Sequence, residues 1–305
     1  EQETAFCDRP CSADADCASL GATFRCQNRS CREPDAVAPT TCSARTLAPG
    51  DNERSVVVGN TARNYVVHVP EDLTGDTAVP LIVDFHTLGG VPSGEAENSG
   101  YRELADQEGL IVAWPEGIEG AWNIGPCCTT SRDVDDVAFA RALVEQVKTE
   151  ACIDVERVYA VGVAMGAGMA YELGCDAADV FAGIAASSFD LLAEADQPCS
   201  PSEAVDVISF RGTADVLVPY EGGAQPAPNL PEVTMNFLGA VGTFERWAEL
   251  NQCSGAPSQA DANGCSTYAN CADGVNVTLC TTEGGMTDWG SAEIAWAALN
   301  RRRAP

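Results

Sequence analysis

Histidine, lysine and long apolar runs are scarce in this chain of 305 residues. The only histidines are His68 and His86, the only lysine is Lys148, and no run of 18 or more apolar residues could form a membrane-spanning helix. Acidic residues number 45 against 17 basic ones, which gives a formal net charge of −28. A field this negative repels phosphate backbones and anionic membrane surfaces, so neither nucleic acid nor a membrane is expected as a partner. The two histidines matter most, because hydrolytic chemistry usually needs one in a defined place.

Cysteine, in contrast, is abundant, with 15 residues. No CxxC pair repeats and no histidine lies near the cysteine-dense segments, so zinc sites are not expected, and no metal or other cofactor is predicted. Disulfides formed in an oxidising compartment explain the count better. The chain begins with Glu1 and not Met, as an exported protein without its signal would, and we predict a secreted, extracellular or periplasmic location. Because 15 is odd, one thiol stays free or pairs between chains; the neighbours Cys127 and Cys128 are candidates, since a bond between them would be strained.

The composition changes along the chain and predicts two domains. Residues 1–32 have too few apolar side chains for a core, so they are predicted to be a disulfide-rich module, serving as an adhesive or spacer unit. Residues 33–41 contain two prolines and are predicted to be an extended linker. Residues 42–305 then form the larger domain. The module's cysteines are Cys7, Cys11, Cys17, Cys26 and Cys31.

Strand and helix patterns alternate from residue 54 onward. Residues 55–58 and 64–69 predict an antiparallel hairpin closed by a Gly59-Asn60 turn. Alternation of strands with helices predicts an α/β fold, with a mostly parallel sheet covered by helices on both faces. The Pro- and Gly-rich residues 220–232 are predicted to be a loop beside the ligand site. Further strands are predicted at 81–85, 110–114, 158–163, 181–186 and 205–210, and helices at 133–148, 165–174, 242–250 and 291–301.

One segment has the form of a nucleophile elbow without its nucleophile. Gly162-Val163-Ala164-Met165-Gly166 follows an apolar strand and opens a predicted helix. That is the context of the G-x-S-x-G motif, in which a tight turn presents a serine above the sheet. Here the central residue is Ala164, and a methyl group cannot attack a carbonyl carbon.

Several other segments, in order and at matching spacing, carry a family resemblance. They include Asp84-Phe85-His86-Thr87-Leu88-Gly89-Gly90, Ala121-Trp122-Asn123-Ile124-Gly125-Pro126-Cys127-Cys128 and Gly212-Thr213-Ala214-Asp215. From Cys42 to about Trp289 the chain resembles the secreted α/β-hydrolases that include polyhydroxybutyrate depolymerases and feruloyl esterases. The resemblance implies an α/β-hydrolase fold for this span.

The resemblance also assigns positions to a Ser-Asp-His triad. Its serine position is Ala164 and its acid is Asp215. Its histidine follows a Gly-Gly pair near the C-terminus, which places Met286 there, or Thr287 as the alternative. A thioether has no ionisable proton and cannot act as a general base. The nucleophile and the base are therefore both replaced.

The other site residues follow from the same comparison. His68 falls in the predicted hairpin and His86 in the oxyanion loop, so neither supplies the missing base. The oxyanion donors would be the backbone N–H groups of Met165 and of Thr87 or Leu88; Thr87 stands where the family usually has glycine, and Arg211 where it often has histidine. The predicted ligand pocket is lined by His86, Trp122, Tyr220 and Trp289, whose aromatic faces suit rings, sugars or polyester segments.

Two functions remain open. The first is a secreted family member that binds an ester, aromatic or polymer ligand without Ser-His-Asp hydrolysis. The alternative is a carboxylic ester hydrolase that uses a non-standard site, or an inactivated variant of one. A third idea, a copper(I) site formed by His86, Met165 and Met286, competes with the simpler interpretation that methionine fills space left by lost polar groups.

Overall fold

The computed structural model describes residues 25–27, 30–32, 46–73, 75, 77–131, 133–193, 198–286 and 290–300. The chain divides into two compact units, Glu1–Cys42 and Ser43–Pro305. The described part of the first unit is an antiparallel pair, β1 (Arg25–Gln27) and β2 (Ser30–Arg32), in which Cys26 is in register with Cys31. The predicted linker and most of the predicted disulfide-rich module lie outside the described residues.

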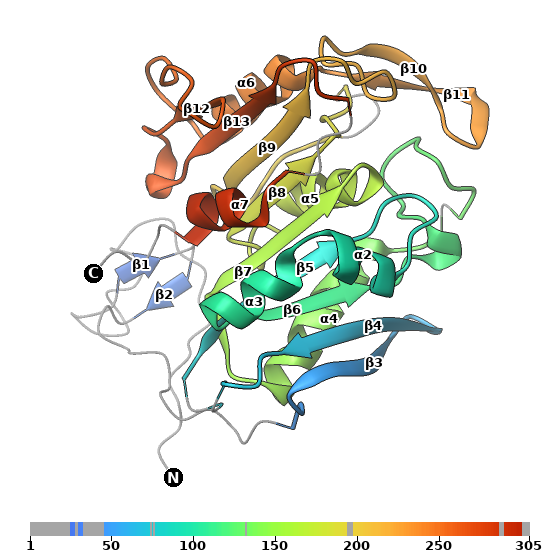
Figure 1. The fold of residues 1–305 in the computed structure, drawn as a ribbon, viewed down its shortest axis with the longest axis vertical. Helices are drawn as coiled ribbons and strands as arrows, with labels where there is room; N and C mark the ends of the chain where they lie inside the picture. Colours follow the sequence, from blue (N-terminus) through green and yellow to red (C-terminus); the bar gives the residue numbers. More distant parts are fainter. Residues whose placement is uncertain are drawn as a thin grey trace. The chain divides into compact units, whose positions relative to one another are not determined.

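The larger unit is built on a sheet of nine strands within the described residues, in the order β12-β13-β9-β8-β7-β5-β6-β4-β3 (Figure 1). Strands β6, β5, β7, β8, β9 and β13 run parallel, and β3, β4 and β12 are antiparallel to their neighbours. This confirms the predicted α/β class. The bounds are β3 Gly50–Val58, β4 Thr61–Val69, β5 Val79–Phe85, β6 Ile111–Pro115, β7 Ile153–Val163, β8 Gly183–Ser187, β9 Asp206–Gly212, β12 Cys265–Tyr268 and β13 Val277–Thr282.

Helices cover both faces of this sheet, and each face has its own apolar core. On one face Leu143, Leu173 and Trp247 pack with strand residues, and on the other Leu104 and Trp296 do. Helices α4, α5 and α6 belong to the first face, and α2, α3 and α7 to the second (Figure 1). Their bounds are α2 Pro92–Asn98, α3 Tyr101–Glu108, α4 Asp136–Glu150, α5 Met165–Asp176, α6 Ala240–Leu250 and α7 Ala292–Leu299, with short 3-10 turns at Ile118–Gly120 and Ala272–Gly274.

The prediction of a loop at residues 220–232 is wrong. It contains β10 (Gly223–Ala227) and the start of β11 (Leu230–Phe237), which form an antiparallel hairpin near the ends of β9 and β13 (Figure 1). Asn229 takes a φ of 65° in the connecting turn, a conformation that asparagine tolerates. Met235 and Phe237 alternate with more exposed residues along β11, so one side of this strand is buried.

Disulfides link the described part of the larger unit. One of them joins Cys127 to Cys128, which corrects the expectation that this pair holds a free thiol. Cys128 has a φ of 72°, so the backbone turns between the two residues and their sulfurs meet. Further disulfides among the described residues are Cys175–Cys199, Cys253–Cys271 and Cys265–Cys280. Among the described residues, no helix is both long enough and apolar enough to cross a bilayer.

Candidate active site

The turn between β7 and α5 has the backbone of a nucleophile elbow. Ala164 takes φ 49° and ψ −116°, and its N–H donates to Ser187 O at 2.8 Å. A Cβ on Gly166 would overlap the carbonyl oxygen of Phe85, and one on Gly162 would lie 2.5 Å from the carbonyl carbon of Gly166. Close packing therefore requires both glycines. The elbow is intact, but the residue it presents has no hydroxyl.

The predicted acid, Asp215, lies in the loop after β9 and is 7% exposed. Its Oδ1 accepts hydrogen bonds from the backbone N–H groups of Leu217 at 2.9 Å and Val218 at 3.0 Å. Because both donors lie in the same turn, the side chain and its loop fix each other. The carboxylate is held in one orientation by its own backbone.

The predicted histidine position lies next to this acid loop. Gly285 O accepts from Ala214 N at 2.8 Å, and Gly284 N donates to Thr213 Oγ1 at 2.8 Å. The structure thus brings the loops of Asp215 and Met286 together. The Met286 residue is 56% exposed. The alternative position, Thr287, and the predicted pocket residue Trp289 lie outside the described residues.

His86 and Trp122 lie beneath the surface, which argues against their predicted place in the lining of the ligand pocket. Both have 0% exposure. Nδ1 of His86 donates to Thr87 O at 2.8 Å, its Nε2 accepts from Gly117 N at 3.0 Å, and its carbonyl accepts from Trp122 Nε1 at 2.8 Å. Desolvation lowers the pKa of His86, in spite of the opposing bond to the Thr87 carbonyl. The neutral ring and the carbonyl of His86 link the end of β5 to residues 117–122 through these hydrogen bonds.

These contacts also remove the copper hypothesis. Both ring nitrogens of His86 are occupied, Met165 is buried, and Met286 is largely exposed. No group of three or more His, Cys, Asp or Glu side chains in the described ranges could hold a metal ion.

The oxyanion candidates differ in what they face. Burial, followed by the neighbouring Asp84, raises the pKa of Glu95 to about 9, and the backbone amide of Thr87 acts in the opposite direction. The Thr87 amide therefore faces Glu95 inside the fold. Met165 is the first residue of α5, where backbone N–H groups have no acceptor within the helix. Met165 and Leu88 remain the better oxyanion candidates.

Tyr220, the remaining predicted pocket residue, is half-buried near the end of β13. Its hydroxyl is 2.8 Å from Thr281 Oγ1, and either oxygen could be the donor. Its ring packs against the core of the α4–α6 face. The contact joins the segment after the acid loop to the strand that carries the Met286 loop.

Sequence reasoning missed a buried ion pair between Arg211 and Asp190. Both side chains are buried, and Arg211 Nη2 also donates to Val218 O at 2.6 Å, in the turn that holds Asp215. Burial raises the pKa of Asp190 to about 6; Arg211 opposes this rise and the charge of Asp215 adds to it. The sequence signal that could have revealed this ion pair was an arginine inside an apolar strand, since a buried charge needs a partner.

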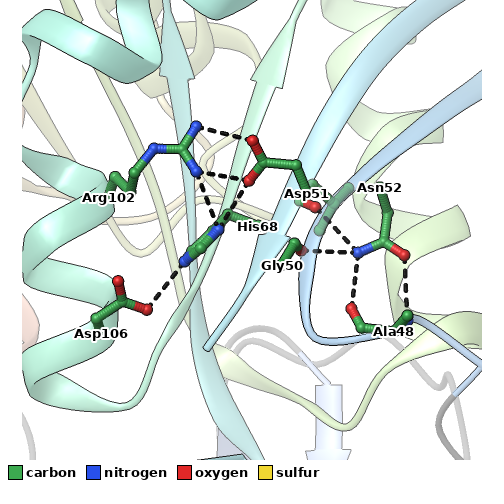
Figure 2. Close-up of polar contacts among 8 residues, drawn as sticks. Ala48, Gly50, Asp51, Asn52, His68, Arg102 and Asp106 are labelled. Atoms are coloured by element: carbon green, nitrogen blue, oxygen red, sulfur yellow. Dashed lines mark hydrogen bonds and ion pairs between the residues drawn. The ribbon is translucent and has the colours of Figure 1, made fainter. Parts of the chain in front are cut away.

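The second histidine, His68, lies in β4 as predicted, and it too has no free nitrogen. Nδ1 lies 2.8 Å from Asp51 Oδ1 and Nε2 lies 2.9 Å from Asp106 Oδ1 (Figure 2). Arg102 donates to both Asp51 oxygens, at 2.6 and 3.0 Å, and its guanidinium lies 4.9 Å from the Trp114 ring centroid. Arg102 lowers the pKa of Asp51. This cluster ties the edge hairpin to α3 and supplies no base to the elbow.

Known proteins are similar to this chain in sequence and in fold. Feruloyl esterase B from Piromyces equi is 38% identical over 250 residues, which cover 80% of this chain and 46% of that protein. The chain thus spans about half the length of that relative. NocK from Nocardia uniformis subsp. tsuyamanensis, an esterase by name, is 31% identical over 258 residues, covering 77% of this chain and 73% of NocK.

Among solved structures, an acetyl xylan esterase from Aspergillus awamori superposes with a TM-score of 0.59 at 15% identity, covering 82% of this chain and 99% of that one. At this identity the likeness speaks for the fold alone. No protein-family model matches the chain. On the sequence relationship, the chain belongs to the esterase-like family of α/β-hydrolases that includes NocK and feruloyl esterase B.

Proposed function

We propose that this chain binds an aromatic or polymer-linked ester without cleaving it by Ser-His-Asp chemistry. The observation that carries the proposal is Ala164 at the centre of an intact elbow. Acyl transfer through this fold needs a nucleophilic oxygen at that position and a base to take its proton. Ala164 and Met286 provide neither, and both histidines of the chain have their ring nitrogens engaged elsewhere.

Ester recognition can outlast the loss of the nucleophile. Backbone N–H groups at the start of α5 attract a carbonyl oxygen or a carboxylate, because the helix end carries partial positive charge. These donors depend on the backbone and not on the side chain at position 164. A bound ester would be polarised but would meet no attacking group.

An export location is part of the proposal. It is supported by the disulfides in the larger unit, since such bonds persist in oxidising compartments. Retention of a disulfide-bonded form during cytosolic expression in reducing cells would count against it.

The test compares four proteins on p-nitrophenyl acetate and methyl ferulate: the unmodified chain, Ala164→Ser, Met286→His and the double variant. Oxyanion donors alone can accelerate hydrolysis by about 10³–10⁴ over water. We expect the unmodified chain and both single variants to stay at or below this range. Only the double variant should exceed it, because nucleophile and base act as a unit.

The alternative function, hydrolysis through a non-standard site, makes a different prediction. It requires turnover by the unmodified chain that survives both single substitutions. Saturable hydrolysis of methyl ferulate by the unmodified chain, well above the oxyanion range, would replace the binding proposal with this one.

A further inference from the structure

Asp215 keeps the geometry of a catalytic acid but has lost the group it would orient. In a Ser-His-Asp triad the carboxylate accepts the Nδ1–H of the histidine. Here the loop beside it carries Met286, which has no N–H to donate. Asp215 is only 7% exposed, and its Oδ1 is bonded to two amides. No described residue donates a hydrogen bond to Oδ2, and Oδ2 is not among the fully enclosed unpaired atoms of the described residues, so it keeps contact with solvent.

No ion pair among the described residues includes Asp215. Arg211 is the cation closest in sequence, and its guanidinium is engaged by Asp190 and by the Val218 carbonyl. The charge of Asp215 is felt at Asp190, whose pKa it helps to raise after the larger effect of burial. Glu283, near Thr213 Oγ1 at 3.4 Å, adds further negative charge on the adjoining loop. An acceptor with a fixed geometry and a negative surround favours a positively charged donor.

Exposed apolar side chains lie on the two loops at Asp215, in a chain with a net charge of −28. Val216 and Leu217 are 68% and 71% exposed, and Met286 on the adjoining loop is also exposed. These three side chains lie on two loops joined by the Ala214–Gly285 hydrogen bond. Exposed apolar side chains on adjoining loops can provide a contact surface for a ligand. A thioether, in addition, makes favourable contacts with aromatic rings.

We propose that this site binds a ligand that carries an organic ammonium group beside an apolar or aromatic body, with the ammonium N–H bonded to Oδ2 of Asp215. The inference rests on the proposed function, because it names the ligand class for the same site. The ammonium takes the place of the missing imidazole N–H, and the body covers Val216, Leu217 and Met286. The net charge of −28 would draw such cations to the surface and speed their encounter.

The test uses two esters that differ by one group. Phenylalanine methyl ester carries an ammonium at pH 6, and methyl 3-phenylpropanoate has hydrogen in its place. Binding of both to the unmodified full chain is measured by isothermal titration calorimetry. A hydrogen bond to a charged group contributes enough to predict at least about tenfold tighter binding of the ammonium ester.

Two variants then locate the effect. Asp215→Asn removes the charge but keeps an oxygen that can accept from Leu217 and Val218. Glu221→Gln removes the same unit of charge from an exposed residue further along the loop. We expect Asp215→Asn to abolish the preference for the ammonium ester, while Glu221→Gln keeps it. Thermal unfolding of each variant checks that it is folded.

Each failure points to a different step. Equal binding of the two esters by the unmodified chain overturns the ammonium site and leaves the proposed function standing. A preference that persists in Asp215→Asn, or falls equally in Glu221→Gln, also overturns it, because the general negative field then explains the result. If neither ester binds, the proposed function and the inference fail together, and release of acid at turnover would refute the proposed function.

Discussion

The backbone at Ala164 is strained, and the strain can be measured. Its φ of 49° and ψ of −116° lie where a residue with a Cβ is rarely found, which costs on the order of 1–3 kcal/mol. Glycine adopts this conformation readily, although it loses about 0.5–1 kcal/mol more than alanine in conformational freedom on folding. We therefore expect Ala164→Gly to raise the free energy of unfolding by roughly 0.5–2 kcal/mol.

Urea denaturation and thermal unfolding provide the assay. For a domain of this size, such a gain corresponds to a rise in Tm of roughly 1–6 °C. Ala170→Gly is the matched control, because Ala170 lies in the interior of α5 and is buried, and it should lose about 1 kcal/mol or more. If Ala164→Gly destabilises the protein as Ala170→Gly does, the elbow holds no strain and the reasoning is refuted.

Three further predictions concern charged groups away from Ala164. Burial raises the pKa of Asp84 from 3.8 to about 7, so the folded protein keeps a proton that the unfolded chain has released; stability should fall as pH rises from about 4 to about 7, and Asp84→Asn should flatten that slope in thermal unfolding. Arg211→Met leaves the buried Asp190 without its cation and should cost about 3–5 kcal/mol in urea denaturation; a loss under about 1 kcal/mol would contradict this. Asp51→Asn weakens more contacts than Asp106→Asn and should lower Tm more, by an amount that shrinks in 1 M salt.

The sequence predicted the central strands well because they are buried on both faces. Residues 81–85 and 158–163 are nearly continuous apolar runs, and they form β5 and β7. Helices α2 and α3 were missed, since each is short and bears mostly polar residues with few buried positions. The β10–β11 hairpin was missed because proline and glycine within residues 220–232 indicate a loop when local composition is the only guide.

The candidate site could be predicted where it consists of a motif of residues close together in the sequence. The Asp215 turn depends on neighbours in sequence, so its motif is visible. The elbow glycines are visible as a motif, although the close contact that requires Gly166 is with Phe85, far away along the chain. The burial of Trp122 could not be predicted, because it depends on a contact with the His86 carbonyl, far away along the chain. The pairing of Arg211 with Asp190 likewise depends on how adjacent strands lie in the sheet.

One titration decides whether the chain binds an ester without cleaving it. Methyl ferulate is titrated into the unmodified chain in a calorimeter, and the ligand is then recovered and resolved by chromatography. We expect saturable heat of binding and recovery of the ester. Ferulic acid should be released no faster than about 10³–10⁴ times the rate in buffer, which is the acceleration that oxyanion donors alone can supply. Ferulic acid released over many turnovers, or no saturable binding of the ester, would contradict the function proposed for Ala164 and its elbow.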